Sequence, residues 1–387
     1  MPLFTLPPIV LDQIRPYVEI RERFERRENR DLNENTADNR SDLLSRFRVG
    51  ATFSIAPSVT GELQYQYAHE LIWTVPANAS TDHSDVSLGY LRHQADGETL
   101  TLGRQKIALG SQRLIGPLEW SNVARSFDGV RFQTKNLDLW AAGVGVGFPR
   151  PRDARLAGAG YTSRYGQTTL LAKWDRLAAG DQAIFTLDHL VSRNLREWNL
   201  EFEGALQAGD NAGRRQEAWA LHARAGYRRI PNVTLYVEVN AASGGADEDV
   251  VRTFDNLYPT NHPFYGIMDL QGWKNMNEIA LGVDYKPRAD VTLKASWHKF
   301  TLRDSSDAWY GAGGGPNRFG ANLFVDPTGR SGRDTGEEFD LEGVWNAAKS
   351  LTLSGGIAVF EPGAFVKNVS GSSDRQVWGF LQAQYRF

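Results

Sequence analysis

Arginines and acidic residues recur at every second position in several short segments of the chain. Arg21 and Arg23 form one such pair, and Glu201 and Glu203 form another. Alternate residues of a β-strand lie on the same face of the strand. Rows of guanidinium or carboxylate groups on one face attract ions and orient charged or dipolar solutes. This spacing therefore favours the guiding of charged solutes over the catalysis of a reaction.

The residue types that catalyse reactions or bind metals lack a comparable pattern. No two of the seven histidines lie at metal-ligand spacing, and the chain has no cysteine. The glycine-rich run at 143–147 lies inside an expected strand, without the following helix that a phosphate loop requires. His222 and the pair Ser296/His298 come nearest to a hydrolase site, but no motif surrounds them. We therefore expect no enzyme activity, no cofactor and no metal site.

The elements that position the charged rows are clearest at the carboxy-terminal end. Val377–Phe387 alternates apolar and polar residues and ends on an aromatic residue, which is typical of outer-membrane β-barrels. The same alternation recurs in segments of the length that a tilted membrane strand needs. We predict an all-β, antiparallel, up-and-down transmembrane β-barrel of about 18 strands. The predicted strands are Tyr17–Arg26, Ser45–Ala56, Val59–His69, Val86–His93, Leu100–Ile107, Phe127–Thr134, Leu137–Phe148, Leu156–Ser163, Thr168–Asp175, Ile184–Ser192, Trp198–Gln207, Ala218–Tyr227, Val233–Ala242, Glu278–Tyr285, Val291–Thr301, Glu338–Trp345, Leu351–Phe360 and Val377–Phe387.

The connections between these segments alternate in length. Short links such as Pro57-Ser58 and Asp96-Gly97 alternate with long ones such as Ser243–Asn277 and Leu302–Glu337. Outer-membrane barrels have short periplasmic turns and long extracellular loops, whereas a soluble sandwich is not expected to sort its links in this way. We predict that residues 15–387 form the barrel. Residues 1–14 are expected to form an N-terminal segment in the periplasm.

The overall composition agrees with such a barrel. Mean hydropathy is −0.43, and no apolar run reaches the ~18 residues of a membrane helix. The net charge of −3 and the lack of a basic stripe argue against binding of nucleic acid. Met1–Ile14 shows no export signal, which we interpret as a signal replaced by an initiator methionine. We expect the bacterial outer membrane as the location and its lipid as a partner.

Strand parity predicts which side chains line the lumen. A charge facing lipid costs roughly 2–4 kcal/mol at the bilayer midplane, so the polar face of each strand must face a wet interior. Early strands are basic and late strands are acidic, which predicts opposite charged walls and a transverse field. The alternative is that these charges only pair with one another. The predicted lumen residues are Arg21, Arg23, Arg46, Arg48, Arg131 and Arg386 on the basic side, and Glu201, Glu203, Glu238, Glu278, Asp284, Glu338, Asp340 and Glu342 on the acidic side.

Arg104 and Asp128 break the parity of their strands, because Arg104 shares a face with Leu102 and Asp128 shares one with Val130. A β-bulge near the rim would turn both side chains into the pore as an ion pair. The alternative is that both stay outside and reach the membrane interface. Arg104 is included among the candidate pore residues.

The link at Ala108–Ser126 is too apolar for a solvated outer loop, since it contains Leu114 and Ile115. Folding into the barrel would cover these residues and constrict the pore, and the alternative is packing on the rim. Its Arg113 and Arg125 are predicted to reach toward the acidic wall. The two longest links, Ser243–Asn277 and Leu302–Glu337, are long enough to cover the mouth.

This link and its flanks contain a set of glycine, arginine and aromatic motifs, namely Gly103-Arg104-Gln105, Gly110, Gln112-Arg113, Trp120, Asn122, Arg125 and Phe127-Asp128-Gly129. A second set is Phe254, Tyr258–His262, Tyr265-Gly266, Asp269 and Asn275, and Glu338-Phe339-Asp340 is a third. Together they resemble the signature of the alginate-export family of outer-membrane barrels. The resemblance implies a monomeric barrel of about 18 strands with a constricted, arginine-lined conduit. It also implies that Arg104, Arg113 and Arg125 line the pore or anchor the loop.

The resemblance and the charged lumen give three functional hypotheses. The first is an outer-membrane channel that guides an anionic oligo- or polysaccharide, the substrate class of the family's best-known member, with a possible periplasmic partner. The second is a general or small-solute uptake porin with a transverse charge field. The third is a structural barrel around another component, which the charged lumen and the apolar loop make the weakest of the three.

Overall fold

The computed structural model describes residues 12–74, 78–147 and 154–387. Eighteen long strands pair antiparallel in chain order, and β1 pairs with β21 to close the sheet into a barrel. Every predicted strand is present, so the predicted fold class is confirmed. The long strands are β1 (Asp12–Glu28), β2 (Arg40–Ala56), β3 (Val59–Thr74), β4 (Ala79–Ala95), β5 (Glu98–Gln105), β6 (Ser126–Gln133), β7 (Leu137–Val146), β8 (Arg155–Ser163), β9 (Gly166–Leu177), β10 (Gly180–Leu195), β11 (Trp198–Asn211), β12 (Arg214–Tyr227), β13 (Val233–Ala242), β15 (Met276–Arg288), β16 (Val291–Leu302), β19 (Asp334–Ala348), β20 (Leu351–Pro362) and β21 (Gln376–Arg386).

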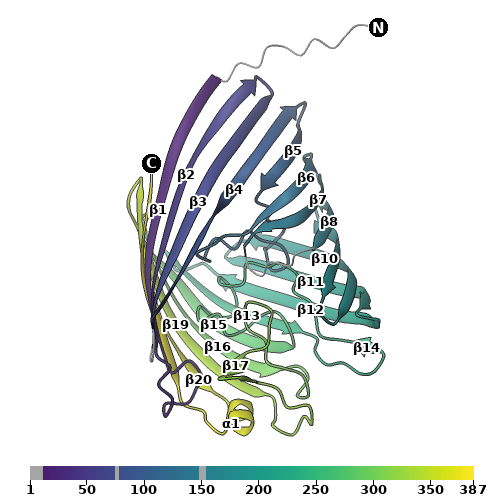
Figure 1. The fold of residues 1–387 in the computed structure, drawn as a ribbon, viewed down its shortest axis with the longest axis vertical. Helices are drawn as coiled ribbons and strands as arrows, with labels where there is room; N and C mark the ends of the chain where they lie inside the picture. The colour runs from purple at the N-terminus through teal and green to yellow at the C-terminus, as the bar shows by residue number, and fades with distance from the viewer. Residues whose placement is uncertain (1–11, 75–77, 148–153) are drawn as a thin grey trace.

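The two ends of the barrel differ. The start of β1 and the carboxy-terminus lie at the end with the short turns, and the long loops lie at the opposite end (Figure 1). These are called the short-turn end and the long-loop end. The predicted N-terminal segment 1–14 falls mostly outside the described residues, and residues 12–14 belong to β1.

The long loops carry four small elements that the alternation of the sequence did not indicate. Strand β14 (Val250–Val251) adds in parallel to β12, and β17 (Arg318–Phe319) pairs with β18 (Asn322–Leu323). Helix α1 (Ala364–Ser370) ends at Gly371, whose φ of 82° lets its N–H bond to the Lys367 carbonyl. Within the described ranges, no helix is both long and apolar enough to cross a membrane.

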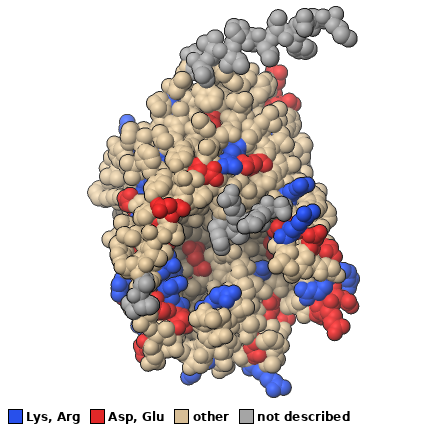
Figure 2. Space-filling view, viewed as in Figure 1, with Lys and Arg blue, Asp and Glu red and all other residues tan. Residues whose placement is uncertain are grey.

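The two faces of the barrel wall follow the alternation of the sequence. On β2, Phe47 and Val49 are exposed on the outside, whereas Arg46 and Arg48 are buried on the inside. Much of the face shown in Figure 2 carries no charged side chain, and the charges gather toward its middle and lower parts. An apolar outer face and a polar inner face are what a membrane-spanning barrel requires.

A β-bulge reverses the parity within β4. Gln64 lies opposite Leu88 but Tyr65 lies opposite Val86, so Ser87 is the extra residue. After the bulge, toward the short turn that follows β4, Tyr90 and Arg92 therefore face the lumen, and Leu91 faces outward. The bulge explains why the faces of this strand were hard to assign from the sequence.

The wall is low where the inserted loop begins. Strands β5 and β6 have 8 residues each, whereas β4 has 17. Gly103 and Gly129 lie opposite each other on β5 and β6, and a Cβ at Gly103 would lie 2.3 Å from the Gly89 carbonyl oxygen. Only glycine allows this close approach of the strands at the point where the chain leaves the wall.

The two faces of β20 provide a test of the outward face. Ile357 faces outward and is half exposed, whereas Ser354 faces the lumen. We expect Ile357→Arg to lower the free energy of unfolding in lipid vesicles by about 2–4 kcal/mol, because its charge enters the hydrocarbon. Ser354→Arg is the matched control and should cost much less. Equal losses for the two variants, measured by urea titration, would contradict the assignment of the faces.

Candidate functional site: a plugged lumen

A loop crosses the lumen from one wall to the other. Residues 106–125 leave β5, and Ile107, Leu114 and Ile115 are buried against Phe254, Tyr258 and Trp273 of a second long loop. Burial of these apolar side chains inside the barrel stabilises the inserted position. The predicted insertion is therefore observed, and residues 106–125 together with residues 252–275 are called the plug.

Backbone pairing joins the two loops of the plug. Ile115 and Tyr258 form a parallel bridge, and the Tyr258 N–H donates to the Leu114 carbonyl at 2.9 Å. The Arg125 guanidinium donates to the carbonyls of Gly116, Tyr258 and Pro259 at 3.0, 2.6 and 3.0 Å. The prediction that Arg125 reaches for the acidic wall is thus corrected, because these bonds go to backbone oxygens of both loops. It anchors the loop, as the sequence resemblance implied.

The basic wall holds one side of the plug. Arg21 donates to the carbonyls of Glu119, Trp120 and Ser121 at 2.9–3.1 Å. Arg23 donates to the Trp120 carbonyl at 2.7 Å, and Arg46 donates to the Glu119 carbonyl at 3.0 Å. All of these arginines are nearly fully buried. They lie on the inward face of the wall, where the plug covers them.

Carboxylates balance this cluster of buried arginines. Glu19 on β1 lies 3.0 Å from Arg46 and 3.2 Å from Arg48, and it also pairs with Arg386 of the closing strand. The Glu119 carboxylate of the plug lies 2.9 Å from Arg48 and 2.5 Å from Lys106. Buried charges of one sign are costly unless they are paired and hydrogen-bonded. Arg46 and Arg48 therefore have carboxylate partners on both the wall and the plug, whereas the hydrogen bonds of Arg21 go to residues of the plug.

The acidic wall holds the opposite side of the plug through Arg113. Its guanidinium lies 3.4 Å from Glu201, 3.7 Å from Glu203 and 3.0 Å from Glu238. It also lies over the Phe264 ring, 4.1 Å from the centroid. The prediction that Arg113 reaches the acidic wall is therefore met by the geometry.

The remaining acids of this wall are also engaged. Glu278 lies 2.6 Å from His298, whose other ring nitrogen lies 3.3 Å from Asp340. Glu338 accepts a hydrogen bond from the Met268 N–H of the plug at 2.8 Å. Asp284 lies 3.4 Å from Arg224. Thus the charges segregate onto opposite walls, and most of them also pair, which combines the two alternatives drawn from the sequence.

Two further candidate residues lie away from the plug. Arg131 faces the lumen and makes two bonds to Asp138, at 2.8 and 2.5 Å. Arg104 does not line the pore, because β5 and β6 pair without a bulge and leave it on the outer face with Leu102. There it binds Asp128 at 2.6 Å and Asp85 at 2.9 Å. The inclusion of Arg104 among the pore residues is therefore corrected.

Two cavities flank the plug at the short-turn end. One, of about 460 Å³, is lined by Tyr17, Glu62, Arg92, Lys106 and Arg386. The other, of about 520 Å³, lies at the acidic wall. Its charged lining consists of Arg113, Arg224, Lys294, Glu201, Glu238, Asp284, Asp340 and Glu342.

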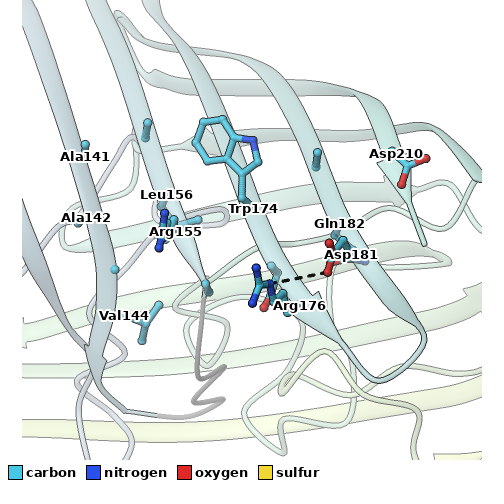
Figure 3. A pocket seen from close by; sticks show the side chains of 15 residues that line it. Ala141, Ala142, Val144, Arg155, Leu156, Trp174, Arg176, Asp181, Gln182 and Asp210 are labelled. Carbon is cyan, nitrogen blue, oxygen red and sulfur yellow. Dashed lines mark ion pairs between the residues drawn. The ribbon is translucent and has the colours of Figure 1, made fainter. Parts of the chain in front are cut away.

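Two cavities also lie at the long-loop end. A vestibule of about 860 Å³ is lined by the plug, by β9 and by the loop around Gly313. A rim cavity of about 1140 Å³ lies between β7 and β11, with Trp174, Arg176 and Asp181 in its lining (Figure 3). Arg176 and Asp181 are 4.0 Å apart there and largely exposed.

Some residues at these sites were not identified from the sequence. Arg92 was missed because the Ser87 bulge shifts its parity. Lys106 was missed because the predicted strand Leu100–Ile107 gives it the outward parity of Leu102, whereas β5 ends at Gln105 and Lys106 belongs to the plug. Glu119 was missed because it lies in the plug rather than in a strand. The second plug loop was expected only as a cover over the mouth, although its apolar Phe254, Tyr258 and Trp273 indicate burial.

Comparison with solved structures shows the same barrel in several channels of Pseudomonas aeruginosa. The chain matches OccK1 (OpdK) with a TM-score of 0.67 at 12% identity, covering 97% of this chain and 99% of that one. It matches OccK5 (OpdH) with a TM-score of 0.65 at 14% identity, covering 97% and 98%. OccK2 (OpdF) in complex with glucuronate matches with a TM-score of 0.60 at 14% identity, covering 97% and 98%. At these identities the likeness concerns the fold.

A search of curated proteins finds no significant match. The family model described as "Alginate export" matches residues 16–144 and 150–380. These ranges include both loops of the plug and nearly every strand. Barrels of the outer membrane have short periplasmic turns and long extracellular loops, so the short-turn end is assigned to the periplasm. The chain therefore belongs to the alginate export family and is a channel of the bacterial outer membrane.

Proposed function

We propose that the channel conducts a small carboxylated sugar, such as a uronate or a short oligouronate, and catalyses no reaction. The observation that carries this proposal is the basic cavity at the periplasmic end. Arg92, Lys106 and Arg386 line it, and Glu62 is the one carboxylate in its described lining. Tyr17 and Tyr90 donate their hydroxyls to Glu62 at 2.5 and 2.6 Å, which disperses its charge.

Arg92 is the cation best placed to meet a solute. It contacts the Thr101 hydroxyl at 3.4 Å and lies 5.0 Å from the Tyr90 ring centroid. Among the described residues it has no carboxylate partner within ion-pair distance. A guanidinium binds a carboxylate through two parallel hydrogen bonds. The glucuronate in the OccK2 structure supports a uronate as the solute, since that channel shares this fold.

A general small-solute uptake porin is the second candidate. It is favoured by the acidic cavity, where Glu201, Glu238, Asp284, Asp340 and Glu342 face Arg113, Arg224 and Lys294. Acids exceed bases on this wall, while bases exceed acids in the opposite cavity. Such an arrangement gives a field across the pore that orients solutes carrying both charges. In either case we infer that the barrel acts as a monomer surrounded by outer-membrane lipid.

The uronate proposal predicts a specific effect of Arg92. We expect glucuronate to block single-channel current in planar bilayers, and Arg92→Gln to raise the half-blocking concentration by about tenfold, because one charge-assisted hydrogen bond is lost. Arg131→Gln is the matched control, since Arg131 already pairs with Asp138. Equal block by glucuronate in the Arg92→Gln variant and the wild type would refute the proposal.

The porin alternative predicts a shift in ion selectivity. Glu342 lies 3.8 Å from Lys294, at the edge of the acidic cavity. Glu342→Gln should shift the reversal potential in a salt gradient toward anion selectivity, because the wall loses one negative charge. An unchanged reversal potential would show that ions do not pass along this wall.

The ion pairs of Arg113 with the acidic wall lead to a prediction about how the plug limits conductance. Removing one partner of a buried ion pair costs about 3–5 kcal/mol, which would release the tip of the loop from Glu203 and Glu238. Arg113→Gln should therefore raise single-channel conductance. Arg224→Gln is the control, because Arg224 pairs with Glu238 and Asp284 on the same wall without belonging to the plug. If both variants conduct like the wild type, the plug is not the constriction.

A further inference from the structure

The vestibule at the outer end has a different chemistry from the cavity at the periplasmic end. It measures about 860 Å³, within the range of about 300–1,000 Å³ that is typical of small-molecule sites. Leu118, Leu257 and Pro259 form part of its apolar lining, and Ser121, Asn122 and Asn256 are among its polar groups. A mixed apolar and amide-rich lining is suited to a polar, uncharged ligand.

The cations of the vestibule are already engaged. Lys173 lies 2.6 Å from Asp255, and Arg23 lies 2.7 Å from Glu25. Lys274 donates to the Gly314 carbonyl at 3.2 Å and lies over the Tyr310 ring. Burial alone would raise the pKa of Asp255, but Lys173 and Lys274 outweigh it and lower the pKa to about 2. Asp255 therefore stays ionised and keeps its lysine partner throughout the physiological range.

The acids of the vestibule also disfavour an anionic ligand. Glu25, Glu70, Asp175, Asp255 and Asp269 all belong to its lining. A carboxylate ligand would meet these five groups without an unengaged cation among the residues just described. The outer vestibule therefore does not recognise the charged group of a solute.

Four buried polar atoms in the lining lack a hydrogen-bond partner within the described part of the chain. They are the acceptors Asp175 Oδ1, Gln182 Oε1 and Asn261 Oδ1, and the donor Asn256 Nδ2. Each side chain is less than a tenth exposed. A buried polar group without a partner costs roughly 1–3 kcal/mol. A ligand that offers several donors and at least one acceptor would remove this cost at all four atoms.

We propose that the outer vestibule is a binding site for the uncharged, hydroxyl-rich part of a saccharide. Each sugar hydroxyl both donates and accepts a hydrogen bond, which matches three acceptors and one donor, whereas a carboxylate only accepts. The inference rests on the proposed function in one respect: the neutral part that binds here belongs to the same sugar whose carboxylate binds near Arg92.

The positions of the two sites set the order in which a solute meets them. The vestibule lies on the outer side of the plug, and the basic cavity lies on its periplasmic side. A sugar arriving from outside would first bind through its hydroxyls, and its carboxylate would then be drawn toward Arg92.

Asymmetric block by a neutral sugar tests the vestibule. In planar bilayers with channels of one orientation, sucrose should block at a lower concentration from the outer side than from the periplasmic side. Asn256→Leu should raise the outer half-blocking concentration by about tenfold, because the unpaired donor is lost. Asn256→Asp is a near-isosteric second variant, which replaces the donor by an acceptor and should act in the same direction. Retained open-channel conductance without sugar shows that each variant is folded.

Asn346→Leu is the control, because this exposed amide lies near the periplasmic end of β19 and outside the linings of both cavities. The inference is overturned if sucrose blocks equally from both sides, or if neither Asn256 variant changes its block. The two proposals fail separately. If Arg92→Gln loses its sensitivity to glucuronate and keeps normal block by sucrose, both proposals are supported. If sucrose blocks the channel and glucuronate does not, the vestibule proposal stands and the uronate proposal is refuted.

Discussion

The attachment of the plug to two oppositely charged walls is the interaction on which the rest of the lumen depends. On one side, wall arginines donate to backbone carbonyls of residues 119–121, and on the other side Arg113 of the plug binds wall carboxylates. Without the loop, Arg21 would lose its carbonyl acceptors and Glu203 would lose its contacts with Ser111 and Arg113. The loop in turn would expose Ile107, Leu114 and Ile115 to water if it left the lumen. Charge pairing and apolar burial therefore stabilise the same position of the loop.

The barrel could be predicted from the sequence because the membrane imposes one simple rule on every strand. Outward side chains must be apolar and inward ones can be polar, so the period of two is visible along the whole chain. The rule fails where the backbone departs from regular pairing. The extra residue Ser87 reverses the faces of β4, and no local residue type marks such a bulge. Helix α1 was missed because it lies in a loop, where packing determines the conformation rather than alternation.

The candidate site was predictable in part for a related reason. Parity assigns a residue to one face of a strand, so Arg21, Arg46, Glu203 and Glu238 could be assigned to the inward face, where they contact the plug. Parity does not show what covers a side chain, so the hydrogen bonds of Arg21, Arg23 and Arg46 to loop carbonyls could not be foreseen. Arg125 illustrates the limit, because its partners are backbone oxygens of two loops far apart in the sequence. Every residue has a backbone carbonyl, so the residue types of the loops do not show which carbonyls will accept these hydrogen bonds.

The low wall at β5 and β6 has a consequence for the mechanics of the barrel. Strand β4 pairs with β5 only over Gly89–Ala95. Its pairing with β3 extends much farther toward the outer end, as far as Ala79, which lies opposite Ile72. Arg104 bridges Asp85, the Val86 carbonyl and Asp128 just where the short ladder stops. One outward-facing guanidinium thus links β4, β5 and β6 where their ladders are short. These ladders have seven residue pairs each, whereas the closing seam between β1 and β21 has ten, so the barrel wall near Arg104 relies more on side-chain contacts than the seam does.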